Sequence, residues 1–202
     1  MINKLLLATH NQAKFNELKT GCQILDKQGI KLISLANLKI DQEPVESGKT
    51  FKENAKIKAE YYGNLTGLPT IGDDGGLVIP ALNNEPGVKS RRWLGYKASD
   101  EELINHTLLH LRGANRSDRT AYLQICLCFY QPKTRITLFS EGKIKGYVAG
   151  KPSNKRLKGY PFRSLFIVEK FNKYYDELTK KEHQIINHRL KALRRLLKNM
   201  VK

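Results

Sequence analysis

The chain has 202 residues, and 40% of them are hydrophobic, so it can bury one substantial core. Its longest apolar runs, such as residues 5–7 and 123–130, fall far short of the roughly 20 residues that span a bilayer. A secretory signal pattern is also missing, so we expect a cytoplasmic protein with no membrane partner. The formal net charge of +17 indicates an anionic partner. Nucleic-acid binding is not favoured, because the lysines are scattered along the whole chain rather than gathered in one tail.

The N-terminal part of the chain predicts strand, helix, strand and helix in that order. Residues 2–8 form a short apolar run typical of a buried strand, and apolar residues then recur at helical spacing over residues 15–25. Residues 31–35 predict a second strand. Thr50 and Glu53 form a capping box, which predicts that a helix begins directly after Thr50.

Two neighbouring carboxylates interrupt the next apolar stretch. Residues 69–72 predict a brief strand that ends at Asp73-Asp74, and residues 77–82 continue as an extended segment in which Pro80 favours an edge or a bulge. Adjacent acids repel each other, and a cation relieves that repulsion. Hard oxygen ligands of this kind suit Mg²⁺, although a solvated acidic turn is the alternative.

The C-terminal part adds strands and two more capped helices. Ser99 and Glu102 form a second capping box, residues 121–130 alternate as in a strand, and residues 136–139 and 164–168 predict further strands. A third box, Thr179 with Glu182, opens a final amphipathic helix whose inner side is apolar and whose outer side carries Lys191, Arg194, Arg195 and Lys198. Strands and helices in no strict alternation indicate an α/β fold with a mixed sheet.

A phosphate cradle is predicted where the first strand meets its helix. Asn11 can cap that helix, the free backbone N–H groups of its first turn point outward, and Lys14 lies one turn in. The loop matches neither of the two familiar glycine-rich phosphate loops. An ordinary capped helix with a surface lysine is the alternative.

Two other patterns carry no predicted function. Cys22, Cys126 and Cys128 are odd in number and fit neither a disulfide framework nor a metal motif, so we expect reduced packing residues. His106 and His110 have the four-residue spacing of a zinc pair. No third ligand accompanies them, so an ordinary helix face is the expectation.

The chain resembles the Ham1-like inosine/xanthosine triphosphate pyrophosphatase family at separated points that occur in the same order. The resemblance covers about residues 4–197, and its matching stretches are Ala8-Thr9-His10-Asn11-Gln12-Ala13-Lys14, Gly48-Lys49-Thr50-Phe51-Lys52-Glu53-Asn54-Ala55, Asp73-Asp74-Gly75-Gly76-Leu77, Pro86-Gly87-Val88-Lys89-Ser90-Arg91-Arg92 and His188-Arg189. The resemblance implies a single domain over residues 1–202. It also implies a mixed sheet with flanking helices in two lobes around a central nucleotide-binding cleft, and a homodimer.

The resemblance further implies hydrolysis of non-standard purine nucleoside triphosphates (ITP, dITP and XTP) to the monophosphate and pyrophosphate. Glu46 and Asp73 would hold Mg²⁺, Asp74 would activate the attacking water or share the metal, and Lys14 would neutralise phosphate charge. The triphosphate would lie on Thr9, His10, Asn11, Gln12, Ala13 and Lys14, with Gly75 nearby.

Base recognition is predicted from the chemistry of position six of the purine, where inosine and xanthosine carry an oxo acceptor. Arg189 offers a donor fork, His188 adds a donor, and Tyr160 and Phe162 supply aromatic faces. His183 is a further candidate for contact with the substrate.

Departures from the family pattern gather on the base side. Gly75 stands where the family commonly has serine, residues 159–163 present no carboxylate where an aspartate is usual, His183 replaces a lysine and Asn187 replaces a serine. We therefore expect the reaction type to be retained and base preference to be relaxed or altered. The alternatives are a nucleotide- or nucleic-acid-binding protein of the same fold without turnover, and a Maf-like pyrophosphatase acting on modified pyrimidine nucleotides.

Overall fold

The structure, a computed structural model, describes residues 2–26 and 28–200. Over those residues the chain forms eight strands, which are β1 (Lys4–Ala8), β2 (Lys31–Ser34), β3 (Thr70–Ile79), β4 (Glu85–Pro86), β5 (Thr120–Gln131), β6 (Ile136–Val148), β7 (Phe166–Val168) and β8 (Lys173–Tyr174). The helices over the same residues are α1 (Gln12–Gly21), α2 (Gln23–Asp26), α3 (Phe51–Thr66), α4 (Asp100–His110), α5 (Lys180–Ile186) and α6 (His188–Met200).

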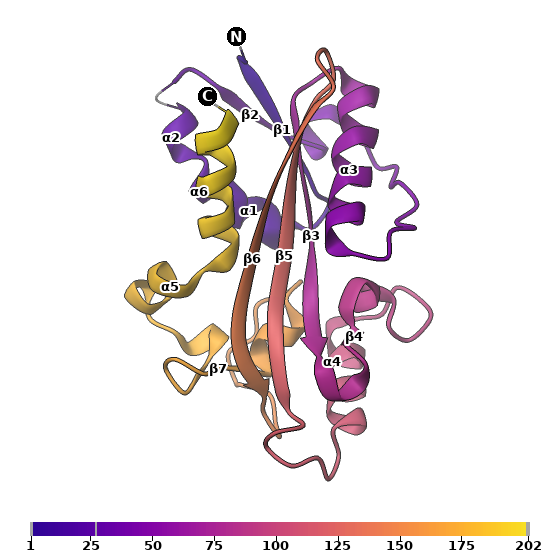
Figure 1. The fold of residues 1–202 in the computed structure, drawn as a ribbon, viewed down its shortest axis with the longest axis vertical. Helices are drawn as coiled ribbons and strands as arrows, with labels where there is room; N and C mark the ends of the chain where they lie inside the picture. The colour runs from indigo at the N-terminus through magenta and orange to yellow at the C-terminus, as the bar shows by residue number, and fades with distance from the viewer. Residues whose placement is uncertain (1, 27, 201–202) are drawn as a thin grey trace. The chain divides into compact units, whose positions relative to one another are not determined.

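The strands make a mixed sheet, as the sequence predicts. Its order is β2-β1-β3-β5-β6-β7-β8, and β4 pairs with β3 (Figure 1). Strand β1 runs parallel to both β2 and β3, whereas β3/β4, β6/β7 and β7/β8 are antiparallel. The parallel pairs need crossover connections, and α1 and α3 lie in those connections.

The described residues divide into two compact units. The first unit comprises residues 1–74, 125–142 and 188–202, and the second comprises residues 75–124 and 143–187. Strands β3, β5 and β6 each contribute residues to both.

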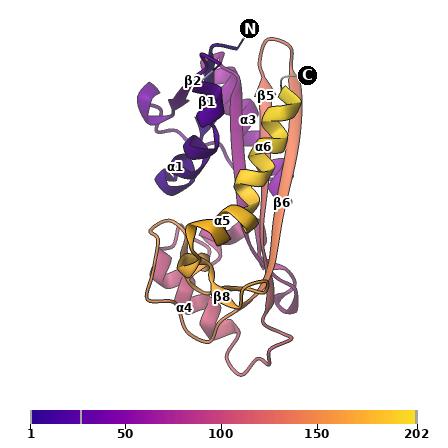
Figure 2. The same cartoon turned by 90° about the vertical axis from the view of Figure 1, so that its left-hand side faces the viewer.

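Helices cover both faces of the sheet in the first unit. Leu5 and Leu7 of β1 pack in one cluster with apolar residues of α1 and α6, whereas Leu6 and Ala8 pack with Tyr62 of α3 in another. The division arises because successive side chains of a strand point to opposite faces of the sheet. Helix α3 accordingly covers one face, while α1 and α6 lie side by side against the other (Figures 1 and 2).

The second unit has its own apolar core. It joins Leu77 and Ile79 of β3 to α4, to the 3₁₀ turn Pro161–Ser164 and to β7, and its largest fully buried side chains include Phe166 and Tyr175. This core therefore fixes the segment that contains Tyr160, Phe162 and Arg163.

Strand β3 corrects one sequence prediction. Asp73-Asp74 was expected at the end of a strand, but β3 continues through both residues to Ile79. The strand continues because its first half pairs with β1 and its second half with β4. Pro80 begins a 3₁₀ turn after the strand instead of lying in an extended edge.

Two other elements differ from their predicted lengths. Strand β6 extends to Val148, far beyond the predicted residues 136–139. The final helix is two helices, α5 and α6, because the backbone of Asn187 leaves the helical region with φ −56° and ψ 100°. The apolar residue Ile185 of α5 is exposed, although the sequence predicts an apolar inner side for this helix.

The capping boxes and the cysteine assignment are confirmed. All three boxes form both of their hydrogen bonds, at the starts of α3, α4 and α5. The three cysteines are free and buried, and burial raises the pKa of Cys126 and of Cys128 to about 12. In the part of the chain that the structure describes, every helix is too short or too polar to cross a membrane.

Close packing of β3 on α3 predicts that Gly72 tolerates no larger residue. A Cβ atom at position 72 would collide with the carbonyl oxygen of Ala55 and lie 2.8 Å from the backbone nitrogen of Ala59. We expect Gly72→Ala to lower the free energy of unfolding by about 1–3 kcal/mol, the usual cost of overpacking. Urea denaturation measures this. Gly150→Ala, where a Cβ atom meets open space, is the control, and equal losses in both variants would contradict the argument.

Candidate functional site

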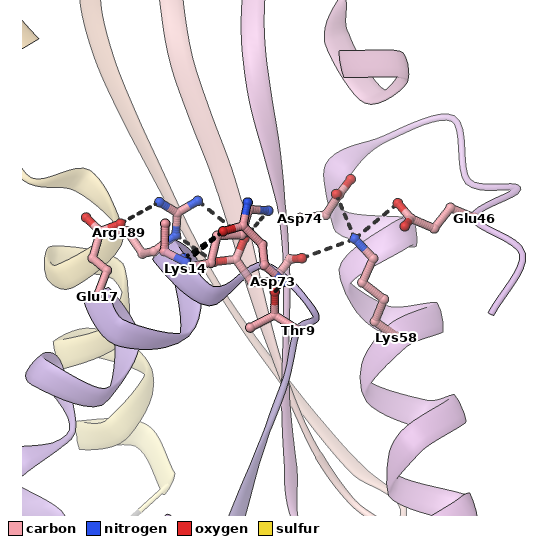
Figure 3. Close-up of polar contacts among 10 residues, drawn as sticks. Thr9, Lys14, Glu17, Glu46, Lys58, Asp73, Asp74 and Arg189 are labelled. Carbon is pink, nitrogen blue, oxygen red and sulfur yellow. Dashed lines mark hydrogen bonds and ion pairs between the residues drawn. The ribbon is translucent and has the colours of Figure 1, made fainter. Parts of the chain in front are cut away.

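Asp73 and Asp74 present their carboxylates to opposite faces of β3 in the first unit. Successive side chains of a strand point to opposite faces. Asp73 therefore contacts residues of α1 and α6, while Asp74 contacts a residue of α3 (Figure 3). Both are buried, with exposed fractions of 2% and 6%. The two charges, expected to share one cation, each have their own cationic partners.

Asp73 is held between two cations. Arg189 Nε donates to Oδ2 at 2.6 Å, and Lys14 Nζ donates to Oδ1 at 3.0 Å (Figure 3). Burial alone would raise the pKa of Asp73, but Arg189 and Lys14 outweigh it and hold that pKa well below its usual range. Arg189 Nη1 also donates to Glu17 Oε2 at 2.9 Å. Asp73 is therefore ionised and charge-compensated at neutral pH.

On the other face, Lys58 joins Asp74 to Glu46. The ammonium Nζ lies 2.9 Å from Asp74 Oδ1, 3.1 Å from Glu46 Oε2 and 3.2 Å from the carbonyl oxygen of Asp73. Burial alone would lower the pKa of Lys58, but Asp74 and Glu46 outweigh that effect and raise it. Three oxygens thus surround one cation. Lys58 brings Glu46 and Asp74 together, and the predicted role of Glu46 as a metal ligand stays a prediction.

Asp74 keeps one acceptor without a donor. Its Oδ2 atom is buried and has no hydrogen-bond partner among the residues that the structure describes. Burial raises the pKa of Asp74, and the attractions of Lys58 and Lys14 oppose the rise. A hard cation or a water molecule would satisfy this oxygen. Within residues 2–26 and 28–200, no three side chains of His, Cys, Asp or Glu already form a metal cluster, because the lysines stand between the carboxylates.

The loop before α1 is less open than predicted. Asn11 caps the helix as expected, but its Oδ1 atom accepts from the N–H groups of both Ala13 and Lys14, and the N–H of Asn11 donates to Thr9 Oγ1. The N–H groups of the first turn were expected to be free, and this expectation is wrong for those of Ala13 and Lys14. The reason is that a short polar cap satisfies the first turn internally.

Two other predicted residues of this loop, His10 and Gln12, have partners outside the acidic pair. His10 Nε2 lies 3.1 Å from the hydroxyl oxygen of Tyr62 and 3.3 Å from the carbonyl oxygen of Gln42. Gln12 is exposed and donates to Asn16. Lys14, by contrast, contacts Asp73 through its Nζ atom.

In the second unit, the predicted Tyr160 and a second aromatic residue, Tyr175, lie against a cation, Arg163. The guanidinium carbon of Arg163 lies 3.4 Å from the ring centroid of Tyr160 and 4.6 Å from that of Tyr175. The ring of His183 lies 4.9 Å from that of Tyr175. Phe162 is buried in the core of the unit. Tyr160 and His183 therefore belong to one cluster with Arg163 and Tyr175, and their contact with substrate stays a prediction.

Three residues of these charge networks were missed by sequence reasoning: Lys58, Glu17 and Asp176. Lys58 had a readable signal, because it lies three residues after Ala55 and four before Tyr62, on the buried side of α3. Glu17 and Asp176 had none. His106 and His110 are neighbours on α4, where both rings pack with that of Trp93.

The fold and site define a mixed α/β protein whose buried acidic pair is surrounded by lysine and arginine, a centre suited to an anion accompanied by a cation. Residues 5–199 match the model of the Ham1 family. The chain belongs to that family.

The chain is similar to known proteins over nearly its full length. The chain is 35% identical to a dITP/XTP pyrophosphatase of Bacillus subtilis (strain 168), covering 98% of this chain and 97% of the relative. It is 34% identical to a dITP/XTP pyrophosphatase of Protochlamydia amoebophila (strain UWE25), with 96% and 95% covered. A solved HAM1 protein from Coxiella burnetii superposes with a TM-score of 0.84 at 33% identity, covering 100% of this chain and 99% of that one.

The Asp73–Arg189 pair generates a prediction about stability. Arg189→Met would leave the buried Asp73 with Lys14 alone, so we expect a loss of about 3 kcal/mol in the free energy of unfolding at pH 7. In the folded wild type the pKa of Asp73 is depressed. The stabilisation that its ionised carboxylate provides is therefore fully present above the unfolded-state pKa of Asp73, and it is lost as the pH falls through the folded-state pKa. In Arg189→Met the folded-state pKa of Asp73 rises. The difference in the free energy of unfolding between wild type and variant should therefore become smaller as the pH falls from 7 to 4.

Chemical denaturation at several pH values measures the deficit. Arg194→Met, on the exposed side of the same helix, is the matched control and should change stability by less than about 0.5 kcal/mol. Asp73→Asn combined with Arg189→Met should be more stable than Arg189→Met alone. A double variant no better than the single one would show that the pair is not the source of the loss.

Asp176 generates a second, opposite dependence on pH. Burial raises its pKa to about 6, against the opposing attraction of Arg163. The folded-state pKa thus exceeds the unfolded value of about 3.9, so the stabilisation is complete below pH 4 and is lost as pH rises through about 6. We expect Asp176→Asn to be more stable than the wild type at pH 8, by about 1–2 kcal/mol, and equally stable at pH 4. Thermal unfolding at both pH values tests this, and a variant that is less stable at pH 8 would contradict it.

Proposed function

We propose that this protein hydrolyses non-standard purine nucleoside triphosphates, namely ITP, dITP and XTP, to the monophosphate and pyrophosphate. Family membership supports the proposal, because the relatives described above are dITP/XTP pyrophosphatases. The observation that carries it is the buried Asp73-Asp74 pair with cations on both faces of β3 and an unpartnered oxygen on Asp74, as judged over the described residues. A centre of this kind can bind a polyphosphate and orient a water molecule.

The donor set fits Mg²⁺. Hard carboxylate oxygens are its preferred protein ligands, and the buried Oδ2 of Asp74 lacks a donor in the described part of the chain. Glu46 and Asp74 would hold the ion, with Asp73 as the further predicted ligand. When bound, Mg²⁺ neutralises charge on the phosphate oxygens and polarises phosphorus toward attack. Lys58 now occupies the space between Glu46 and Asp74 and would turn toward phosphate.

The residues of the chain then have distinct roles. Lys14 and Lys58 neutralise phosphate oxygens, and Asp74 orients a water molecule and accepts its proton. The water oxygen forms a bond to the α-phosphorus, the bond from that phosphorus to the bridging oxygen breaks, and pyrophosphate leaves with the electron pair. A carboxylate with a raised pKa is a better proton acceptor than an ordinary aspartate, which favours Asp74 for this step.

Substrate contacts complete the proposal. The phosphate side would include Thr9, His10, Asn11, Gln12, Ala13, Lys14 and Gly75, and the base side Tyr160, Phe162, His183, His188 and Arg189. His188 and Arg189 are buried, and Arg189 binds Asp73 and Glu17, so a contact of Arg189 with the base stays a prediction. We also propose that the protein acts as a homodimer in the cytoplasm.

Pyrophosphate release from ITP, XTP, ATP, GTP and CTP tests the proposal. We expect turnover of ITP or XTP that EDTA abolishes and Mg²⁺ restores. Asp74→Asn should lower kcat about 100-fold or more, because it removes both a proton acceptor and a charged ligand. The monophosphate must appear in equal amount with pyrophosphate.

Asp41→Asn is the matched control, since Asp41 is an exposed aspartate of the same unit. It should keep wild-type turnover. Release of inorganic phosphate instead of pyrophosphate would sink the assignment of the bond that is cleaved. Salt-sensitive DNA binding without turnover of any nucleotide would favour the nucleic-acid-binding alternative.

A further inference from the structure

The second unit holds a partly buried charge pair, Arg163 with Asp176, that the proposed reaction does not use. Arg163 is 7% exposed, and its guanidinium lies against the rings of Tyr160 and Tyr175. Asp176 follows Tyr175 directly in the chain, and its carboxylate feels the positive charge of Arg163. The core of the unit fixes both segments, because Phe162 and Tyr175 belong to the same apolar cluster.

Asp176 has unused hydrogen-bonding capacity. The backbone N–H of Leu157 donates to its carboxylate, yet Oδ2 is shielded from solvent and lacks a hydrogen-bond partner within the described residues. The neighbouring Glu177 adds a second negative charge and donates nothing. A buried acceptor without a donor destabilises a fold, so a ligand that brings an N–H group would be bound favourably here.

The surroundings indicate the chemistry of such a ligand. Tyr160, Tyr175 and the ring of His183 form an aromatic cluster next to this charge pair. Flat heterocycles are bound by aromatic faces together with a few placed polar groups. Residues 159–163 themselves carry no carboxylate.

We infer that Asp176 supplies the carboxylate that reads the purine base and that Arg163 is its positioning residue. The inference rests on the proposed function and names the group that would set its base preference. A 6-oxopurine carries an N–H at position one, next to the oxo group, and an ionised carboxylate only accepts hydrogen bonds. Adenine presents a lone pair at that nitrogen, so the same carboxylate repels it. Asp176 therefore favours hypoxanthine and xanthine over adenine.

Asp176→Asn is the decisive variant, because it keeps the shape of the side chain and removes its charge. For the wild type we expect kcat/KM to be at least about tenfold higher for ITP than for ATP, the usual value of one hydrogen bond to a charged group. In Asp176→Asn the ratio should fall to within about threefold of unity, with the larger change on ITP. Glu169→Gln, at an exposed carboxylate of the same unit, should leave the ratio unchanged.

Equilibrium binding separates this inference from the proposed function. Calorimetric titration of the full chain with IMP and with AMP requires no turnover. Preference for IMP that is lost in Asp176→Asn supports the inference even if no triphosphate is hydrolysed, in which case only the proposed reaction fails. Equal binding of IMP and AMP by the wild type, an equal loss on both in the variant, or no binding of either would overturn it.

Arg163→Gln tests the positioning role. If Arg163 acts through Asp176, Arg163→Gln should lower the ITP-to-ATP ratio, and adding Asp176→Asn should lower it less than about twofold further. A purely structural role would instead reduce kcat/KM for both nucleotides equally and leave the ratio intact. Thermal unfolding of each variant shows that the comparison is made on folded protein.

Discussion

A carboxylate removed from water is the constraint on which the first unit depends. Asp73 lies in the middle of β3, and an isolated buried carboxylate costs several kcal/mol unless cations and hydrogen bonds compensate it. The compensation comes from Lys14 of α1 and from Arg189, which lies 116 residues further along the chain. These contacts fix where α1 and α6 begin against the sheet. Gly142 of β6 permits this, because a Cβ atom there would lie 2.5 Å from the carbonyl oxygen of His188.

The alternation of side chains along β3 explains how adjacent acids coexist. Asp73 and Asp74 would repel each other in one pocket, but the strand sends them to different faces and to different cations. Lys58 is the cation of the second face, and its three oxygen partners already form a cation-binding arrangement. Under the proposed function, the lysines held by these carboxylates would turn to phosphate, and a divalent ion would take their place.

Local signals predicted much of this structure, and non-local contacts explain what they did not. Capping boxes and apolar periodicity depend on neighbouring residues, so α3, α4, β1 and β5 could be predicted from the sequence. The continuity of β3 depends on pairing with β1 and β4, and the length of β6 depends on β7, so neither could be read from local composition. For the site, the sequence motifs predicted Lys14, Glu46, Asp73 and Asp74. In the structure, Asp73 contacts Lys14 and Arg189, and Lys58 contacts both Glu46 and Asp74. Asp176 stayed hidden, because its environment is created by Arg163, thirteen residues away, and by burial.

The two acidic centres differ in what they require of the fold. Asp73 is stabilised by its neighbours, since the attraction of Arg189 and Lys14 exceeds the cost of burial. Asp176 is not, because burial exceeds the attraction of Arg163 and raises its pKa to about 6. Functional groups are commonly kept in environments that lower stability, because binding a ligand needs unsatisfied donors or acceptors. An acceptor that the fold leaves unsatisfied can accept a hydrogen bond from a ligand. The Oδ2 atom of Asp176 is such an acceptor among the described residues, and Asp176 lies close enough to Arg163 to feel its charge. Residues 159–163, which include Arg163, carry no carboxylate. Under our inference, Asp176 in the turn that follows β8 would supply the base-reading carboxylate that residues 159–163 lack.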